Sequence, residues 1–347
     1  ITGSVGKTTT KDMVAAALGA KLQVLKTPAN FNNDIGTPLT LLGLEAEHQA
    51  AVIETGMNHF GEIAYLGSMV RPDIAVISNI GDAHIEFLGS REGILKAKCE
   101  IFEHLKPHGL AILNGDDALL NTVSLPIRMV RCGQSEHCGV RITEIDDHGV
   151  DGITCTVETA RCRYELVTAA PGEHMAYPMA IAVAVGEELG LSREEITRGV
   201  ADYRPSGSRM RVIHLPQGRI ILDDCYNASP QSVAAALEVL AKTTCERKVA
   251  VLGDMGELGA LTEQAHYNMG ALAAMLGIDF LVAIGPKAVK IADGAAQSGG
   301  AVLHFSTKEE AVAELREQLE PETAMLIKAS HAMHFEQLVE QLRGDYD

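Results

Sequence analysis

Short apolar runs alternate with stretches of helical periodicity over residues 1–120 of the chain. A short apolar run that stops at polar or glycine-rich positions is typical of a buried strand, and apolar residues spaced three and four positions apart are typical of a helix. Their alternation indicates βαβ units and hence a mostly parallel sheet. We expect strands at 50–53, 74–77 and 109–113, and helices at 11–18 and 90–105, the second capped by Ser90.

The pattern changes farther along, where short β-like runs at 152–157 and 163–167 lie between turn residues. These runs predict an antiparallel addition at the sheet edge, after which a helix is expected at 176–189. A cluster of Pro, Gly and Ser at 204–208 indicates a domain boundary. The predicted fold class is therefore α/β, with one domain at 1–207 and another at 208–347. The second domain is expected to contain strands at 220–222, 248–252, 280–284 and 324–327 and helices at 229–240, 263–276 and 308–319.

Composition excludes several classes of function. The 347 residues include 29 Lys and Arg against 46 Asp and Glu, a formal charge of −17, and no basic run interrupts this excess, so no nucleic-acid partner is expected. No apolar stretch reaches the roughly 20 residues of a membrane span. The seven cysteines form no CxxC pair, which favours reduced thiols over a zinc or disulfide framework. We therefore expect a soluble, cytoplasmic protein.

The chain opens directly into a glycine-rich turn, TGSVGKTTT at residues 2–10. Such a turn before a helix leaves backbone N–H groups pointing at an anion, and the helix dipole adds positive potential. A lysine at position 7 can reach the β- and γ-phosphates of a nucleotide, and the hydroxyl at position 8 suits Mg²⁺. The strict pattern would place glycine where Ile1 stands, so this spacing is a variant, and a chance turn is the alternative. The residues expected to hold phosphate are Gly3, Ser4, Gly6, Lys7, Thr8 and Thr9.

Two polar residues follow predicted strands at the edge where parallel strands end. Glu54 closes the run 50–53, and His84 follows the run 74–77 after a short loop. Ligands of open α/β sheets lie outside the carboxyl ends of the strands, so the Glu54 carboxylate can hold the Mg²⁺ of a nucleotide. Magnesium prefers oxygen ligands, which makes His84 an unusual neighbour. The alternatives are an ordinary strand-terminal glutamate and a capping or solvent-facing histidine.

Lys98 lies on the apolar stripe of the helix predicted at 90–105. Positions 94, 98, 101 and 102 share one face of that helix. An inward ammonium is costly unless it is paired or deprotonated. A lysine with a lowered pKa can act as a nucleophile or react with carbon dioxide to give a carbamate, whose anion can bind a metal. The alternative is a lysine that reaches the surface or pairs with Glu100 or Glu54.

Several stretches of the sequence resemble the Mur ligases, the ATP-dependent amide-forming enzymes of peptidoglycan assembly. The phosphate loop is shared by the wider superfamily, including folylpolyglutamate synthetases. The asparagine-rich segment and the DDxYNAxP segment are more specific, and they resemble the member that adds D-alanyl-D-alanine to UDP-N-acetylmuramoyl-tripeptide. The stretches are TGSVGKTTTK at 2–11, NFNNDIGTPLTLL at 30–42, IETGMNHFGEI at 53–63, NIGDAHIEFLGSREGILKAKCEI at 79–101, DDCYNASPQS at 223–232 and VLGDMGELG at 251–259.

The resemblance implies a three-domain enzyme, of which residues 1–207 are the central P-loop ATPase domain and residues 208–347 a C-terminal Rossmann-like domain. Because a buried strand normally precedes a phosphate loop, we expect a further segment before Ile1, which the resemblance identifies as a UDP-binding domain. The implied reaction uses ATP to convert the terminal carboxylate of UDP-MurNAc-tripeptide into an acyl phosphate, which the amine of D-Ala-D-Ala attacks. A monomer is expected.

The resemblance also implies roles for individual residues. Lys7 and Thr8 would hold the phosphates and a first Mg²⁺, with Glu54 as a metal ligand. His84 would bind a second Mg²⁺, and Lys98 corresponds to the lysine that is carbamylated in this family. Asn30, Asn32 and Asn33 would lie beside the muramoyl peptide; Arg209, Asp224, Tyr226 and Asn227 beside the nucleotide; and Asp254, Glu257, His266, Lys328, Ser330 and His331 at the cleft from the C-terminal side.

The sequence departs from the family in two places. A His-Asn-x-x-Asn pattern common in relatives reads HMAYP at 174–178, so other groups must hold adenine, and KASH at 328–331 replaces the commoner KGSR. A P-loop phosphotransferase or NTPase and an inactive nucleotide-binding chain are the competing interpretations. Phosphate release that requires both the carboxylate and the amine would distinguish the ligase from both.

Overall fold

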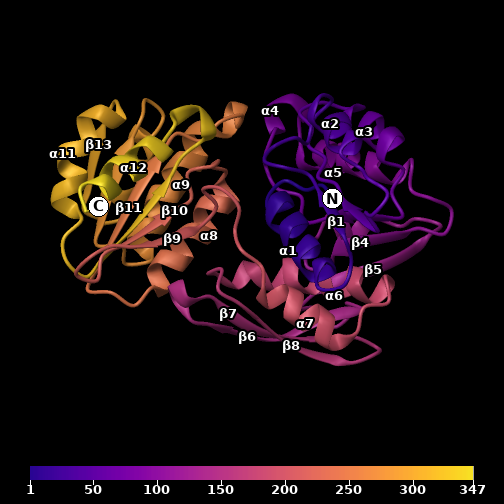
Figure 1. Ribbon diagram of the computed structural model, residues 1–347. Helices are drawn as coiled ribbons and strands as arrows, with labels where there is room; N and C mark the ends of the chain where they lie inside the picture. The colour runs from indigo at the N-terminus through magenta and orange to yellow at the C-terminus, as the bar shows by residue number, and fades with distance from the viewer. Residues whose placement is uncertain (347) are drawn as a thin grey trace. The chain divides into compact units, whose positions relative to one another are not determined.

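Parallel strands alternate with helices along the chain, whose computed structural model describes residues 1–346. The chain forms two compact units (Figure 1). Unit 1 comprises residues 1–147, 152–169 and 173–206, and unit 2 comprises residues 148–151, 170–172 and 207–347. Both units contain mostly parallel sheets, which confirms the predicted fold class. In the described part of the chain, no helix combines the length and the apolar composition that crossing a bilayer requires.

Residues Ile1 and Thr2 join the strands of unit 1 into one surface. Ile1 N donates to Ile53 O at 2.7 Å, and Thr2 N donates to Val76 O at 2.9 Å, so the start of the chain lies between β2 and β3. The phosphate loop therefore leaves the middle of a parallel sheet. Strand β1 (Val24–Lys26) pairs with β2 (Ala50–Val52), and the sheet continues from β3 (Ile74–Ile77) through β4 (Leu110–Asn114), β5 (Arg128–Gly133), β6 (Val140–Asp147), β7 (Ile153–Glu158) and β8 (Arg163–Thr168).

The last three strands of this sheet form the predicted β-rich edge addition. Strand β7 is antiparallel to both β6 and β8. Two groups of helices pack on the sheet, one containing α1, α6 and α7 and the other α3 and α5. The helices of unit 1 are α1 (Lys7–Gly19), α2 (Gly36–Leu42), α3 (Glu62–Val70), α4 (Ile85–Leu88), α5 (Arg91–Cys99), α6 (Ala176–Glu188) and α7 (Arg193–Ala201).

Helix α5 carries the predicted inward lysine and begins at the predicted cap. Ser90 Oγ accepts from Gly93 N at 3.1 Å, which satisfies one of the free amides of the first turn. The helix ends earlier than expected, at Cys99, and a 3₁₀ turn, η1 (Glu100–Phe102), extends it to 102, short of the predicted end at 105. Ile94 and Ala97 pack against β3 in the core of unit 1, which fixes the orientation of the helix.

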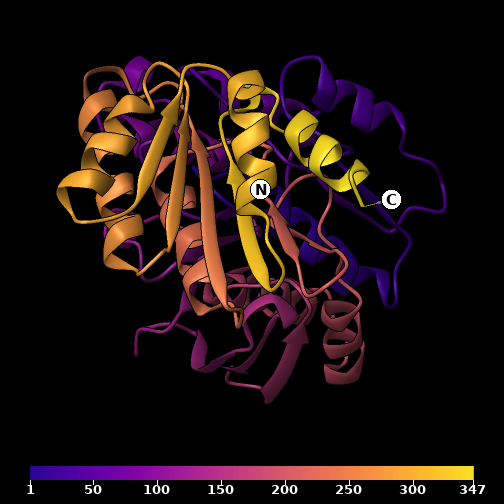
Figure 2. The same ribbon diagram turned by 90° about the vertical axis from the view of Figure 1, so that its left-hand side faces the viewer.

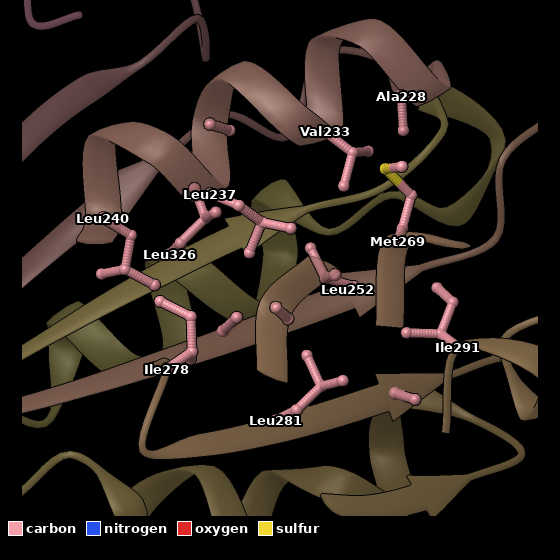
Figure 3. Close-up of a cluster of buried hydrophobic side chains, with 14 of the residues drawn as sticks. Ala228, Val233, Leu237, Leu240, Leu252, Met269, Ile278, Leu281, Ile291 and Leu326 are labelled. Carbon is pink, nitrogen blue, oxygen red and sulfur yellow. The ribbon is translucent and has the colours of Figure 1, made fainter. Parts of the chain in front are cut away.

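A six-stranded sheet forms the centre of unit 2, in the order β13-β12-β11-β14-β10-β9, and only β9 is antiparallel to its neighbour. Successive strand residues face two cores. Leu326 packs with α8, α9 and α10 (Figure 3), whereas Met325 and Ile327 pack with α11 and α12. The sheet thus has helices on either side (Figure 2). The elements are β9 (Arg211–His214), β10 (Ile220–Asp223), α8 (Pro230–Lys242), β11 (Arg247–Gly253), α9 (Thr262–Met275), β12 (Phe280–Ile284), α10 (Val289–Gln297), β13 (Val302–Phe305), α11 (Lys308–Gln318), β14 (Thr323–Lys328) and α12 (Glu336–Gly344).

Candidate active site

The phosphate loop has the glycine conformations that its turn requires. Gly3 and Gly6 have φ angles of 156° and 77°, and a Cβ on Gly3 would lie 1.9 Å from Ser78 Oγ. Two residues after the end of β3, Asn79 Oδ1 accepts from Val5 N at 2.9 Å. The end of β3 therefore fixes the first half of the loop. The amides from Gly6 onward, at the start of α1, are the ones that a helix N-terminus offers to an anion.

Ser4 and Lys7 supply further polar atoms to this turn. Ser4 Oγ is buried and has no hydrogen-bond partner within residues 1–346, although buried hydroxyls normally have one. Lys7 Nζ donates to Gly3 O at 2.9 Å, so its ammonium lies over the loop. A phosphate oxygen in the turn would accept from Ser4 Oγ beside a positive charge, which fits the predicted nucleotide site.

Thr8 and Glu54 meet beside the loop. Thr8, which shares the first turn of α1 with Thr9, donates from Oγ1 to Glu54 Oε2 at 2.8 Å. Asn32 Nδ2 donates to the other carboxylate oxygen, Glu54 Oε1, also at 2.8 Å. Glu54 is 2% exposed. An adjacent hydroxyl and carboxylate are the kind of oxygen ligands that Mg²⁺ prefers, so these two residues fit the predicted metal site.

His84 lies at the start of α4, in the loop that begins with Asn79. Its φ angle is 65°, its side chain is half-buried, and its carbonyl accepts from Phe87 N at 3.1 Å. In the described part of the chain, no group of three or more His, Cys, Asp or Glu side chains is arranged to hold a metal ion. The predicted ligand set contains one carboxylate and one imidazole, so a metal here also needs ligands of other kinds.

Lys98 is 1% exposed on the inward face of α5, together with Ile94. Burial lowers the pKa of Lys98 well below its ordinary value, and the charge of Lys7 lowers it further. Among the described residues, no carboxylate lies within 4.0 Å of the Lys98 amine, and Glu100 instead accepts from Gly61 N at 2.8 Å. Lys98 is therefore neither an exposed surface lysine nor one paired with Glu54 or Glu100. Burial and the charge of Lys7 thus favour the neutral form of this amine, and a neutral amine is the form that reacts with carbon dioxide.

The asparagines predicted beside the muramoyl peptide have three different environments. Asn30 is exposed. Asn32 holds Glu54, as described above. Asn33 Oδ1 accepts from Gly36 N at 2.8 Å and from Ile35 N at 3.2 Å, so it holds the turn that leads into α2. The segment therefore supports the carboxylate at the phosphate loop as well as facing solvent.

In unit 2, a cation lies on an aromatic ring. The guanidinium carbon of Arg209 lies 3.6 Å from the centre of the Tyr226 ring, and the His331 ring lies 5.5 Å from the same centre. Arginine is well suited to phosphate, and a flat aromatic surface to stacking on a base. The arrangement brings together two residues that the sequence placed beside the nucleotide.

Asp224 and Lys328 form an ion pair at the carboxyl ends of β10 and β14. Lys328 Nζ lies 2.5 Å from Asp224 Oδ2 and donates to Asn227 O at 2.8 Å. Lys328 is 2% exposed. Its ammonium therefore holds the loop that follows β10, which carries the predicted nucleotide-side residues.

The loop after β11 is tied to two neighbouring loops through Asp254. Its Oδ1 accepts from Lys287 N at 3.0 Å and from Ala288 N at 2.8 Å, and its carbonyl accepts from Ser330 N at 3.0 Å. Glu257 is exposed in the same loop with a φ angle of 59°. These contacts bring Asp254, Glu257 and Ser330 to one edge of the sheet.

His266 was expected at a cleft surface, but this expectation is wrong because the residue is fully buried. Its Nε2 accepts from Met255 N at 2.9 Å, and its Nδ1 lies 2.7 Å from Thr262 O. These partners assign the ring proton to Nδ1. Burial lowers the pKa of His266. The ring therefore supports the loop of Asp254 from inside the unit.

Comparison with known proteins agrees with this geometry. The model of the Mur ligase middle domain matches residues 1–186, and the model of the Mur ligase, glutamate ligase domain matches residues 208–331. The chain belongs to the Mur ligase family. It is 36% identical over 346 residues to the UDP-N-acetylmuramoyl-tripeptide–D-alanyl-D-alanine ligase of Bacillus subtilis, covering 99% of this chain and 75% of that protein.

Solved structures give the same family likeness for this Mur ligase. MurF from Acinetobacter baumannii matches with a TM-score of 0.91 at 35% identity, covering 99% of this chain and 75% of that one. MurF ligase from Thermotoga maritima, solved in complex with ADP, matches with a TM-score of 0.88 at 27% identity, covering 100% of this chain and 79% of that one. The chain thus spans about three quarters of the length of these relatives.

The departure from the family at 174–178 has a structural consequence in this Mur ligase. Met175 and Pro178 are buried at the start of α6, where proline is tolerated in the first turn of a helix. Tyr177 OH donates to Asp116 Oδ2 at 2.9 Å. Tyr177 therefore contributes a polar group from this segment, and that group is bound to Asp116.

Two residues of the site were not predicted from the sequence, Asn79 and Lys11. The only signal for Asn79 in the sequence is its place two positions after a buried strand. Lys11 lies on an inward stripe of α1 with Val14 and Leu18, all buried, and the stripe argument used for Lys98 would have found it.

Proposed function

We propose that the protein joins UDP-N-acetylmuramoyl-tripeptide to D-alanyl-D-alanine in peptidoglycan precursor synthesis, coupled to the conversion of ATP to ADP and phosphate. A carboxylate oxygen of the tripeptide attacks the γ-phosphorus of ATP, which gives an acyl phosphate and ADP. The amine of D-Ala-D-Ala attacks the acyl carbon, a proton leaves the nitrogen, and inorganic phosphate leaves. The contact between Thr8 and Glu54 beside the phosphate loop carries this proposal.

Unit 1 would provide the phosphoryl-transfer chemistry. Its loop amides and the Lys7 ammonium bind the phosphates of ATP and stabilise the charge that develops during transfer. Two magnesium ions, one held by Thr8 and Glu54 and one by His84 and modified Lys98, would offset the charges of the γ-phosphate and the incoming carboxylate, which otherwise repel each other. The phosphate-binding residues are Gly3, Ser4, Gly6, Lys7, Thr8 and Thr9.

Lys98 would act in its carbamylated form. Its neutral amine nitrogen bonds to the carbon of carbon dioxide and releases a proton, which leaves an anion where a cation would be unfavourable. Lys98→Ala is expected to abolish ligation, and short carboxylates that fill the vacated space are expected to restore part of it. Turnover unaffected by the substitution would remove Lys98 from the mechanism.

Unit 2 would complete the nucleotide and substrate sites. Arg209 would reach the nucleotide phosphates, with Asp224, Tyr226 and Asn227 beside the ribose and adenine. We assign residues 1–207 to the central ATP-binding domain and residues 208–347 to the C-terminal domain of a monomeric, cytoplasmic enzyme. The substrates would be bound by Asn30, Asn32, Asn33, Asp254, Glu257, Lys328 and Ser330.

Phosphate release tests the proposal on the complete gene product that carries this chain. The protein is incubated with ATP and Mg²⁺, with each substrate alone and with both. We expect sustained release only when UDP-MurNAc-tripeptide and D-Ala-D-Ala are both present, together with a product of their summed mass less water. ATP turnover that does not depend on either substrate would support a P-loop NTPase instead. Nucleotide binding without turnover would support an inactive chain.

A further inference from the structure

Lys11 is a buried cation at the centre of a charged cluster in unit 1. Its residue is 1% exposed, and its Nζ donates to Thr27 O at 2.7 Å. Two carboxylates lie near the same ammonium, with Asp12 Oδ1 at 3.3 Å and Glu54 Oε2 at 4.0 Å. A buried charge needs such partners because it has lost its water. Lys11 therefore links α1, the end of β1 and the end of β2 at one point.

Three residues lie against the Glu54 carboxylate, and Lys11 is one of them. Thr8 and Asn32 each donate a hydrogen bond to one carboxylate oxygen. Lys11 lies nearest to Oε2, the oxygen that accepts from Thr8. The backbone of Glu54 is fixed as well, since its N–H donates to Thr27 Oγ1 at 2.9 Å. The carbonyl of the same threonine accepts from Lys11, so one residue couples the ammonium to the carboxylate's backbone.

Lys26 provides an internal comparison for the charge of Lys11. Its Nζ lies 2.8 Å from Asp12 Oδ1, the same carboxylate oxygen that Lys11 approaches, but its side chain is 48% exposed. Lys26 donates to Asp12 and not to Glu54. Two lysines thus neutralise one aspartate, and only Lys11 lies between that aspartate and Glu54.

We propose that Lys11 is a positioning residue for the metal site, which fixes the orientation of the Glu54 carboxylate toward Thr8. The inference rests on the proposed role of Glu54 as a magnesium ligand. Without the Lys11 ammonium, Asp12 keeps Lys26 as its partner, but Glu54 loses the positive charge that lies beside Oε2. Residues that orient a metal ligand typically contribute about 10–100-fold to metal affinity.

The test compares Lys11→Met with Lys26→Met, which removes a like charge from the same aspartate. Mn²⁺ replaces Mg²⁺, and its binding to the ADP-loaded protein is followed by the loss of the free-ion signal in electron paramagnetic resonance. We expect the Mn²⁺ dissociation constant of Lys11→Met to rise about 10-fold or more and that of Lys26→Met to stay within about twofold. Unchanged affinity in Lys11→Met, or an equal loss in both variants, would overturn the inference.

Two further variants separate the role of Lys11 from a folding defect and from the proposed role of Glu54. Lys11→Met with Asp12→Asn removes one charge of each sign, so this variant retains the charge balance if the single variant does not fold. It is expected to bind Mn²⁺ as weakly as the single variant, and wild-type affinity would overturn the inference. Glu54→Gln tests the proposed function separately: undiminished Mn²⁺ affinity there would remove Glu54 as a ligand, and the role of Lys11 with it.

Discussion

Replacing Lys98 by methionine should make the protein more stable while removing its activity. Lys98 is 1% exposed and, within residues 1–346, no carboxylate lies within 4.0 Å of its amine. Burial disfavours the protonated form of this lysine, so its pKa lies well below the ordinary 10.5. At pH 7, giving up the proton costs at most about 5 kcal/mol, at about 1.4 kcal/mol per pH unit. Methionine has a similar volume and no charge.

We expect Lys98→Met to raise the free energy of unfolding by about 1–4 kcal/mol at pH 7, the range found when buried charges are replaced by apolar residues. The gain should shrink as pH rises. Between the folded pKa of Lys98 and 10.5, the unfolded chain holds a proton that the folded chain lacks, so wild-type stability increases with pH. The difference between the two proteins should therefore fall by up to about 1.4 kcal/mol per pH unit.

Urea unfolding at pH 7 and pH 9 measures both effects. The buffers are purged of carbon dioxide, so that the wild-type amine is not carbamylated. Lys96→Met is the matched control, because Lys96 lies on the same helix but is exposed, and its effect should stay within about 0.5 kcal/mol. A Lys98→Met protein that is no more stable than wild type at pH 7, or a stability difference that does not change with pH, would contradict this prediction.

Three other predictions follow from single contacts. Lys7→Ala should weaken ADP binding about 10-fold or more in calorimetry, because it removes the cation that lies over the phosphate loop; unchanged affinity would contradict this. His266→Gln should flatten the pH dependence of stability below pH 6.5. Burial lowers the pKa of His266, so as pH falls the unfolded chain gains a proton that the folded chain does not bind. The wild-type free energy of unfolding therefore falls by up to about 1.4 kcal/mol per pH unit. Equal slopes in urea unfolding at pH 5.5 and 7.5 would exclude that role. Ser90→Ala should cost about 1 kcal/mol in the same assay, since Ser90 caps α5, and a neutral result would show that the cap contributes nothing.

Elements governed by local patterns could be predicted closely from the sequence. The runs 74–77 and 280–284 are strands with the predicted bounds, because continuous apolar residues between polar stops have few alternatives in an α/β fold. The cap at Ser90 is likewise a local signal, as is Pro230 in the first turn of α8. Each of these features depends on a few neighbouring residues.

Elements that depend on partners distant in the sequence were not predicted. Strand β13 (Val302–Phe305) pairs only with β12 at the sheet edge and is half-exposed along its length, so it lacks a buried apolar run. Helix α10 (Val289–Gln297) buries alanine and glycine against α9, and small residues give little periodic contrast. In both cases the element is stabilised by packing or pairing with its neighbour, which the local sequence does not show.

The two buried lysines of unit 1 show why burial alone does not define a functional role. Lys11 and Lys98 lie on inward helical stripes and are each 1% exposed, so the sequence pattern describes them in the same way. Their surroundings differ: Asp12 and Glu54 lie within 4.0 Å of Lys11, whereas the strongest neighbouring influence on Lys98 is the like charge of Lys7. A buried amine beside carboxylates is an ion-pair partner that orients them, whereas burial near another positive charge favours the neutral form of an amine. Which of these outcomes applies is decided by loops that the topology brings together, and it becomes visible only in the folded chain.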